Sequence, residues 1–381
     1  MNRYIPVAQP RIGIKEMFFT FRALKEKEIS GYSTQYIPKF ENEFAKLCGT
    51  DYAIAVNSGT SALHLALVAL GIQDGDEVLV SAYTNMATFF PILQLGGVPI
   101  PVDVDPITFN MDPQDLRRLV SSKTKAIMVV HIFGHPAPMF EICEIAKQYG
   151  IPIIEDCAEA HGAMIAGKKV GSFGAIGCFS FYANKLVTTG EGGMLTTSDQ
   201  KLRDSIKSIS SLSFGKHQKF LHERDGYNFR LSNVQAGIGL AQLNRLPAML
   251  RDKRKIVGIY NEYLEGHVNI QTPIELPGYT SVYWMYLIKL KKFSSNTTQK
   301  LISKLESKGI EARPGFIPFS DQIHVMKQFE ISPRETPIAS AAGLSTLYLP
   351  SGPSLKRNQI KYIVKNLNNE LERVSEEEKL S

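Results

Sequence analysis

Short segments that are apolar throughout recur along the first half of the chain, with helix-like segments between them. The strand candidates are AIAV (53–56), EVLVS (77–81), VPIPV (98–102), AIMVVHI (126–132) and IPIIED (151–156). Strands without polar alternation are buried on both faces, so this pattern predicts an α/β fold with a mostly parallel sheet covered by helices. Ligands bind such sheets beyond the carboxyl ends of the strands. The segments to inspect are therefore 57–61, 82–88, 131–135, 156–161 and 180–185.

The chain has 381 residues, more than one hydrophobic core usually holds, so we expect two domains. Residues 1–250 form the predicted large domain, and residues 251–381 form a smaller α+β domain with strands at 280–290 and 345–350. Apolar spacing predicts helices at 13–30, 39–48, 62–70, 112–120, 139–149, 199–211, 232–245, 248–266, 297–308 and 355–373. The charged tail SEEEKLS is expected to fray.

Charge and cysteine usage exclude several classes of protein. The net charge is +6, and no dense Lys/Arg block with interleaved aromatics is present, so we expect no nucleic-acid partner. The N-terminus lacks a signal-peptide core, and no apolar run is long enough to span a bilayer. The cysteines, Cys48, Cys143, Cys157 and Cys178, show no metal-ligand spacing, which indicates buried free thiols. We therefore expect a cytoplasmic protein without a bound metal or a membrane partner.

The turn at 57–61, NSGTS, lies between an apolar strand and an apolar helix. A helix that begins there presents free backbone N–H groups and the positive end of its dipole to an anion, so Ser58, Gly59 and Thr60 are candidate phosphate contacts. The alternative is an ordinary strand-to-helix connection with a helix cap. The turn lacks the GK[ST] of a nucleoside triphosphate site.

The segment GCFSFYANKLVTTGEGGML (177–195) runs from an apolar strand through Lys185 to a Gly-rich loop, 190–193. A lone lysine in a turn is usually a solvated side chain. In a closed site it can instead be desolvated and nucleophilic. The glycines either provide flexibility or let the backbone turn tightly beside a bound cofactor and a subunit interface.

Three strand-end features combine chemically. Asp156 ends a buried strand, where a carboxylate needs a cationic partner. Pyridoxal 5'-phosphate needs a lysine for its aldehyde, a carboxylate for its pyridinium nitrogen and a cradle for its phosphate, and Lys185, Asp156 and the turn at 57–61 could supply these. Spacing alone leaves open the alternative that Asp156 is a helix cap and the Gly-rich loop a plain turn.

Four strings resemble the DegT/StrS family: GTSALHLAL (59–67), IIEDCAEAHGA (153–163), the segment 177–195 and GYNFRLSNVQAGIGLAQL (226–243). The resemblance extends from about residue 5 to about residue 370. It implies a fold-type I, pyridoxal-phosphate-dependent aminotransferase that acts on nucleotide-linked sugars, with pyridoxamine phosphate as the intermediate cofactor form. It also implies a homodimer with shared active sites.

The resemblance assigns roles to individual residues. Lys185 would form the imine with the cofactor and later move the proton, and Asp156 would pair with the pyridine nitrogen. Glu159 stands where the family often has Gln, near the cofactor's 3-hydroxyl. Ser180 would add a hydroxyl to the phosphate contacts of Ser58, Gly59 and Thr60, and Asn228 would reach the phosphate of the neighbouring subunit. His161 either lines the site or is structural.

Three positions depart from the family pattern. Asn85 stands where many relatives carry an aromatic residue stacked on the cofactor ring, and Tyr83 can point elsewhere, so the stacking partner is open. His135 and Ile317 stand where some relatives have Gln and His. Both positions are expected near the sugar, so the sugar or its nucleotide can differ in this chain.

The implied reaction moves the amino group of L-glutamate onto a keto-deoxysugar, with C4 of a 4-keto-6-deoxy sugar as the favoured site. A 3-keto sugar aminotransferase is an alternative. A sugar dehydratase of the same fold is a second alternative, but those relatives typically replace the lysine with His. A non-catalytic regulatory protein is a third, and it would be expected to have lost part of the constellation. A Rossmann-type nicotinamide enzyme would need GxGxxG after the first strand, which NSGTS does not supply.

Overall fold

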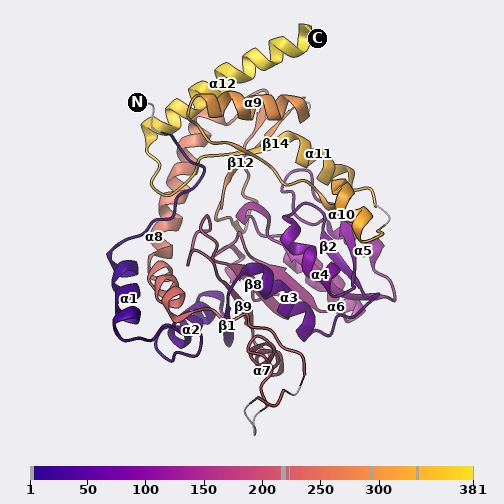
Figure 1. Cartoon of the computed structure of the whole chain (residues 1–381). Coiled ribbons are helices and arrows are strands. Elements are labelled where there is room, and N and C mark those ends of the chain that lie inside the picture. The colour runs from indigo at the N-terminus through magenta and orange to yellow at the C-terminus, as the bar shows by residue number, and fades with distance from the viewer. Residues whose placement is uncertain (1–3, 216–219, 223, 292–294, 332–333, 381) are drawn as a thin grey trace.

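The computed structural model describes residues 4–215, 220–222, 224–291, 295–331 and 334–380. Its centre is a seven-stranded sheet in the order β1-β9-β8-β5-β4-β2-β3 (Figure 1). All neighbours from β8 to β3 pair in parallel, whereas β9 runs antiparallel to both β8 and β1. The predicted mostly parallel, mixed sheet is therefore confirmed. Its strands are β1 (Tyr52–Val56), β2 (Glu77–Ser81), β3 (Val98–Val102), β4 (Thr124–Val130), β5 (Ile153–Asp156), β8 (Ile176–Ser180) and β9 (Gly193–Thr197).

Helices cover both faces of this sheet because successive apolar side chains of each strand point to opposite faces. Val78 and Val80 share a core with α3 (Gly59–Ala69), α4 (Phe90–Gln94) and α7 (Gln200–Ile209). Leu79 faces the opposite way, into a core with α5 (Pro113–Leu119) and α6 (Met139–Tyr149). On that second side, α2 (Ile37–Cys48) covers β1, β8 and β9. The η1 (Met86–Thr88) and η2 (Ile132–Gly134) turns follow β2 and β4 at the carboxyl edge.

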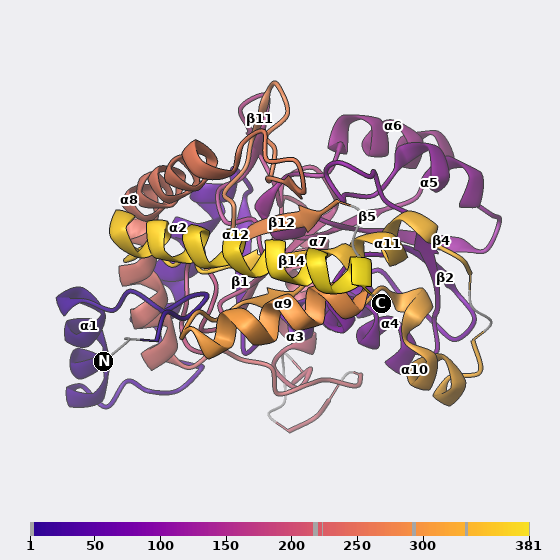
Figure 2. The same ribbon diagram turned by 90° about the horizontal axis from the view of Figure 1, so that it is seen from above.

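The C-terminal part forms a separate layer with its own core. Its four-stranded antiparallel sheet has the order β10-β12-β14-β13 and is covered by α9 and α12, which lie side by side (Figure 2). The elements are β10 (Ile270–Gln271), β12 (Tyr286–Leu290), α9 (Ser295–Ser307), β13 (Arg313–Pro314), η3 (Phe319–Asp321), α10 (Ile323–Gln328), α11 (Pro337–Ser345), β14 (Thr346–Leu349) and α12 (Arg357–Leu380). A small sheet of β6 (Met164–Ile165), β7 (Lys168–Lys169) and β11 (Tyr279–Thr280) joins the two parts.

One long helix, α8 (Asn233–Leu264), belongs to both cores. Leu246 and Met249 pack in the core of the large part, whereas Val257 and Tyr260 pack in the C-terminal core. The prediction of two helices at 232–245 and 248–266 is therefore wrong. Pro247 removes one backbone hydrogen-bond donor, but packing at both ends holds the helix continuous. The division at residue 250 falls inside α8 and stays a prediction.

Three other predicted boundaries are wrong. The helix predicted at 13–30 is α1 (Ile14–Lys25), which ends where Lys27 adopts a positive φ of 60°. The strand predicted at 280–290 is interrupted at Tyr283 (φ 48°), where the chain leaves the sheet to bond the backbone of residues 133 and 134. The tail predicted to fray continues α12 to Leu380, since the helix is already anchored by Leu367, Leu371 and other buried residues. A polar segment links the helices predicted at 199–211 and 232–245, and part of it, residues 216–219 and 223, lies outside the described residues.

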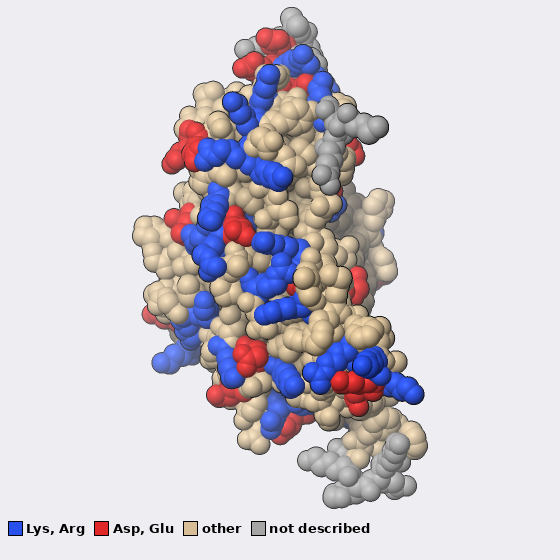
Figure 3. Space-filling view, turned by 90° about the vertical axis from the view of Figure 1, so that its left-hand side faces the viewer, with Lys and Arg blue, Asp and Glu red and all other residues tan. Residues whose placement is uncertain are grey.

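The side of the molecule that carries α1 and α8 shows many Lys and Arg side chains with acidic side chains among them (Figure 3). Three ion pairs involve residues of α8: Arg245 with Glu16, Asp252 with Arg11, and Arg254 with Glu275. Among the described helices, none is both long and apolar enough to cross a membrane.

Candidate active site

The carboxyl ends of the central strands surround a cavity of about 380 Å³. Seven of the eight predicted site residues line it: Ser58, Gly59, Thr60, Asp156, Glu159, Ser180 and Lys185. The eighth, Asn228, is exposed on a segment that bridges to Ser211, so it does not face the cavity of its own chain. Residues separated by more than a hundred positions thus meet because parallel strands end at one edge.

The N-terminus of α3 forms one wall of the cavity. Ser58 caps the helix, and its hydroxyl accepts the N–H of Ser61 at 3.0 Å. Gly59 starts the helix directly against the end of β8, since a Cβ atom at this position would lie 2.7 Å from the Cβ of Ser180. The wall therefore offers backbone N–H groups and the Ser180 and Thr60 hydroxyls, which are suited to an anion.

The Gly-rich loop, residues 190–193, packs against the N-terminus of α3 and so supports the same wall. Gly190 and Gly192 have φ values of 84° and 156°, which an L side chain rarely adopts. A Cβ atom on Gly193 would collide with the carbonyl oxygen of Ser58. The loop thus lets β9 begin in contact with the capped helix, which agrees with the interpretation that the glycines provide a tight turn at the site.

Asp156 is the buried carboxylate of the cavity. One of its oxygens accepts the Thr88 hydroxyl at 3.0 Å and the other accepts the Ala158 N–H at 3.1 Å. Burial raises the pKa of Asp156, and these hydrogen bonds and Lys185 oppose the rise. Within the described ranges no ion pair to Asp156 is found. A cationic group of a ligand in the cavity could therefore form an ion pair with this carboxylate.

Lys185 places an amine in the same cavity. Its Nζ is 3.8 Å from Glu159 Oε1 and 3.7 Å from the centre of the Trp284 ring. Burial lowers the pKa of Lys185, while Glu159 and Asp156 raise it. Glu159 also accepts the Phe133 N–H at 2.7 Å, and burial raises the pKa of this carboxyl to about 7. The amine is therefore desolvated but close to two carboxyl groups.

Lys253 is a buried lysine that could be an alternative to Lys185 as the amine that binds a cofactor. It extends from α8 and donates to the carbonyl oxygen of Ser351 at 2.6 Å and to its hydroxyl at 2.8 Å. Burial lowers the pKa of Lys253 to about 7. Lys253 is not among the residues that line the main cavity, so its amine is used to join α8 to the end of the C-terminal sheet.

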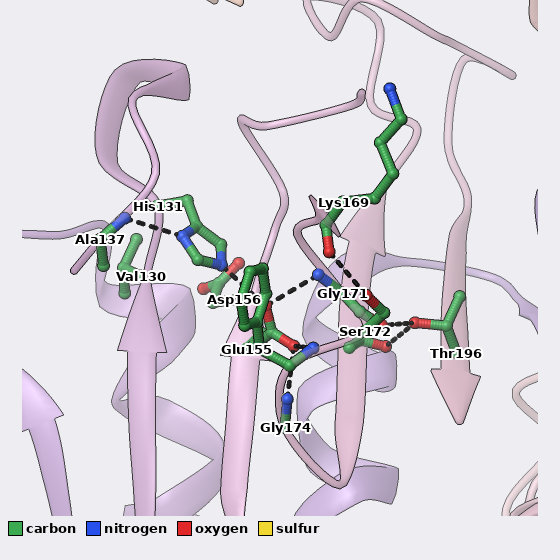
Figure 4. Close-up of polar contacts among 12 residues, drawn as sticks. Val130, His131, Ala137, Glu155, Asp156, Lys169, Gly171, Ser172, Gly174 and Thr196 are labelled. Carbon is green, nitrogen blue, oxygen red and sulfur yellow. Dashed lines mark hydrogen bonds and ion pairs between the residues drawn. The ribbon is translucent and has the colours of Figure 1, made fainter. Parts of the chain in front are cut away.

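A hydrogen-bond network beneath the cavity aligns the ends of β4 and β5 (Figure 4). Glu155 accepts the N–H groups of Gly171, Phe173 and Gly174 at 2.7–2.8 Å. His131 accepts the Ala137 N–H on Nδ1, so its Nε2 donates to Glu155 at 3.1 Å. His131, Glu155 and Cys157 lie close enough to share a metal ion, but the network already occupies the oxygens of Glu155 and the ring nitrogens of His131.

Several candidate residues lie outside the cavity lining. Tyr83 is buried and bonded to the Thr346 hydroxyl at 2.6 Å, whereas Asn85 lines the cavity as the cap of η1. His161 packs among phenylalanine rings, and burial lowers its pKa to about 3. His135 stacks on Tyr279, and Ile317 is exposed, so neither lines the main cavity of this chain.

The lining residues that were not among the predicted site residues include Thr88, Trp284, Arg313, Phe316 and Tyr348. Four of these come from the C-terminal part, where no strand-to-helix pattern indicated a site. Their approach depends on the turn at Tyr283 and on the C-terminal layer lying over the carboxyl edge of the central sheet. The one sequence signal for this part is the lone tryptophan of the chain, in the string YWMY at 283–286.

Comparisons with known proteins agree with this fold and cavity. A model of the DegT/DnrJ/EryC1/StrS aminotransferase family matches residues 18–368. The chain is 40% identical over 366 residues to the GDP-perosamine synthase of Escherichia coli O157:H7, covering 96% of this chain and 98% of that protein. It is 39% identical over 363 residues to the GDP-perosamine synthase of Caulobacter vibrioides, covering 94% and 96%. The Spr1654 structure from Streptococcus pneumoniae, in its PMP form, has a TM-score of 0.93 at 25% identity, covering 99% and 100%.

These matches and the fold define a fold-type I, pyridoxal-phosphate-dependent aminotransferase. The chain belongs to the DegT/DnrJ/EryC1/StrS family, whose members named here include nucleotide-sugar aminotransferases. The residues present fit the cofactor. The cavity contains a buried carboxylate without a cationic partner among the described residues, a capped helix N-terminus and a desolvated lysine.

Replacing Gly59 with alanine should weaken binding of pyridoxal phosphate to the apoenzyme by roughly tenfold or more, because the added methyl group forces α3 away from Ser180. Absorbance titration with the cofactor and competition by inorganic phosphate measure this loss. Gly258→Ala is the matched control, since a Cβ atom there meets open space on α8. Equal cofactor affinity in the two variants would contradict the proposed cradle.

Proposed function

We propose that this enzyme transfers the amino group of L-glutamate to C4 of a nucleotide-linked 4-keto-6-deoxy sugar, for cell-surface polysaccharide biosynthesis. The observation that carries the proposal is that Lys185, Asp156 and the N-terminus of α3 line the same cavity. The two relatives named GDP-perosamine synthase support a GDP-linked sugar and amination at C4. Free cysteines at all four positions support a cytoplasmic enzyme.

Each site residue has a proposed role in this reaction. Ser58, Gly59, Thr60 and Ser180 hold the cofactor phosphate, and Asp156 keeps the ring nitrogen protonated. Bound pyridoxal phosphate supplies an aldehyde for the amino group and a ring that accepts electrons. Lys185 attaches the cofactor, removes the proton from the α-carbon of glutamate and later delivers a proton to the sugar carbon. Glu159 would contact the cofactor on the side of its 3-hydroxyl group.

Arg313 offers a further contact for the substrates. It is the one cation besides Lys185 among the residues that line the described cavity. Its guanidinium is half-exposed and bonded to Glu311 at 2.7 Å, so it is oriented yet accessible. Both substrates are anionic, through the carboxylates of glutamate and the diphosphate of the nucleotide, and a guanidinium is suited to either group.

The test is glutamate-dependent amination of a panel of GDP-, UDP- and dTDP-linked 4-keto and 3-keto sugars, with products identified by mass and NMR. We expect a 4-amino product from a GDP-linked 4-keto sugar. Lys185→Ala should lower turnover by roughly three orders of magnitude while still binding the cofactor, and Lys168→Ala, an exposed lysine, should retain activity. Normal transamination by Lys185→Ala, or loss of a hydroxyl instead of amination, would refute the proposal.

We also propose that the enzyme is a homodimer with shared active sites. One face of α1 packs on α8, but Ile14, Met17, Phe18, Phe21 and Leu24 form an apolar stripe on its other face, and each is more than half exposed. Contiguous exposed apolar surface of this kind marks a protein–protein interface.

Contacts of Tyr32, in the loop after α1, connect the region of the stripe to Asn228. The Tyr32 ring contacts Arg230 and the Tyr32 hydroxyl accepts a hydrogen bond from Ser211, which bridges to Asn228. Asn228 therefore lies on a surface continuous with the loop that follows α1. A second copy seated on this surface would bring Asn228 toward the partner's phosphate cradle.

Replacing both Met17 and Phe21 with aspartate should convert the dimer to a monomer with little activity, as measured by sedimentation velocity and by amination assays. Buried carboxylates at two positions of the stripe would leave charges desolvated in the interface. Phe140→Asp on α6 is the control, because this exposed phenylalanine lies away from α1. A double variant that remains dimeric and active would exclude this interface.

A further inference from the structure

Trp284 reaches the cavity from the C-terminal part and is held rigidly at its wall. It is the only tryptophan in the chain. Its backbone N–H donates to the carbonyl oxygen of Phe133 at 3.0 Å, and its ring Nε1 donates to the carbonyl oxygen of Asn184 at 2.9 Å. The ring also stacks on Phe133, with 6.0 Å between centroids. Trp284 is therefore fixed to the large part through Phe133 and to the residue before Lys185.

The amine of Lys185 has two favourable neighbours. Its Nζ lies 3.7 Å above the Trp284 ring and 3.8 Å from Glu159 Oε1. An ammonium over the face of an indole is stabilised by the ring quadrupole, and a carboxylate at this distance adds direct attraction. Burial alone would drive the amine to lose its proton, so these two contacts, together with the nearby Asp156 carboxyl group, determine how much of the positive charge it retains.

Glu159 is suited to this task where glutamine would not be. Its Oε2 accepts the Phe133 N–H, which leaves Oε1 directed toward Lys185. A glutamine at this position could keep the contact with Phe133 but would carry no negative charge. Phe133 itself connects both neighbours of the amine, because its N–H binds Glu159 and its carbonyl binds Trp284.

We propose that Glu159 and Trp284 together form an ammonium site that holds the Lys185 side chain whenever its amine is protonated and not linked to the cofactor. Both are positioning residues, since they act through Lys185. The inference rests on the proposed role of Lys185 in the transfer reaction. The site keeps the released amine in the cavity, within reach for its return, and sets the proton affinity of that amine.

The test uses the apoenzyme, so that it does not depend on catalysis. Lysines are converted to their ¹³C-dimethyl forms, the Lys185 signal is assigned by its absence in Lys185→Ala, and its pKa is read by NMR titration. Trp284→Leu and Glu159→Gln should each lower the pKa of Lys185 by about half a unit or more. Trp284→Phe, which keeps an aromatic face, should lower it less, and Phe316→Leu, another aromatic residue at the cavity, should leave it unchanged.

A second measurement needs no substitution at Trp284. Because the chain has one tryptophan, its fluorescence in the wild-type apoenzyme should change as Lys185 titrates, and Lys185→Ala should abolish that change. An unaltered Lys185 pKa in folded Trp284→Leu and Glu159→Gln proteins would overturn the ammonium site. Cofactor attachment at another lysine would instead refute the proposed function. The pKa values of Lys185 in the apoenzyme variants would still decide whether the ammonium site exists.

Discussion

The close approach of α3 to the ends of β8 and β9 is the constraint on which the rest of the site depends. Gly59 lies against Ser180, and Gly193 lies against the Ser58 carbonyl, so neither position has room for a Cβ atom. This contact aligns the helix N-terminus with the strand that leads to Lys185. The Glu155 network does the same for β4 and β5, and Asp156 follows Glu155 directly. Backbone packing therefore sets the spacing between the anion cradle, the carboxylate and the amine.

Desolvation gives these groups their chemistry. Burial raises the pKa values of Asp156 and Glu159 and lowers that of Lys185, so each group depends on its neighbours to hold a charge. A cationic ring nitrogen would stabilise ionised Asp156, and the pair of Glu159 and Trp284 stabilises the ammonium of Lys185. With the cofactor bound, the two carboxylates would divide between two cations, one from the cofactor and one from the chain.

Local sequence was sufficient to predict the central sheet and five residues at its edge, because apolar strands alternate with helices and parallel strands end together. These five are Ser58, Gly59, Thr60, Asp156 and Lys185, and the family resemblance added Glu159 and Ser180. The resemblance supplied their roles. The cavity residues that the C-terminal part contributes could not be predicted from local sequence. The Trp284 contact depends on a left-handed turn at Tyr283 and on hydrogen bonds to Phe133 and Asn184, both at least 100 positions away. The continuity of α8 depends on packing that outweighs the effect of Pro247. Long-range packing of this kind has no local sequence signal.

The most direct test of the account is to locate the cofactor on the chain. The protein is loaded with pyridoxal phosphate, reduced with borohydride and digested, and the modified lysine is identified by mass spectrometry. The account predicts one label, on Lys185, accompanied by loss of the yellow absorbance. A label on the buried Lys253, whose pKa burial lowers to about 7, or a colourless protein that takes up no cofactor, would contradict it.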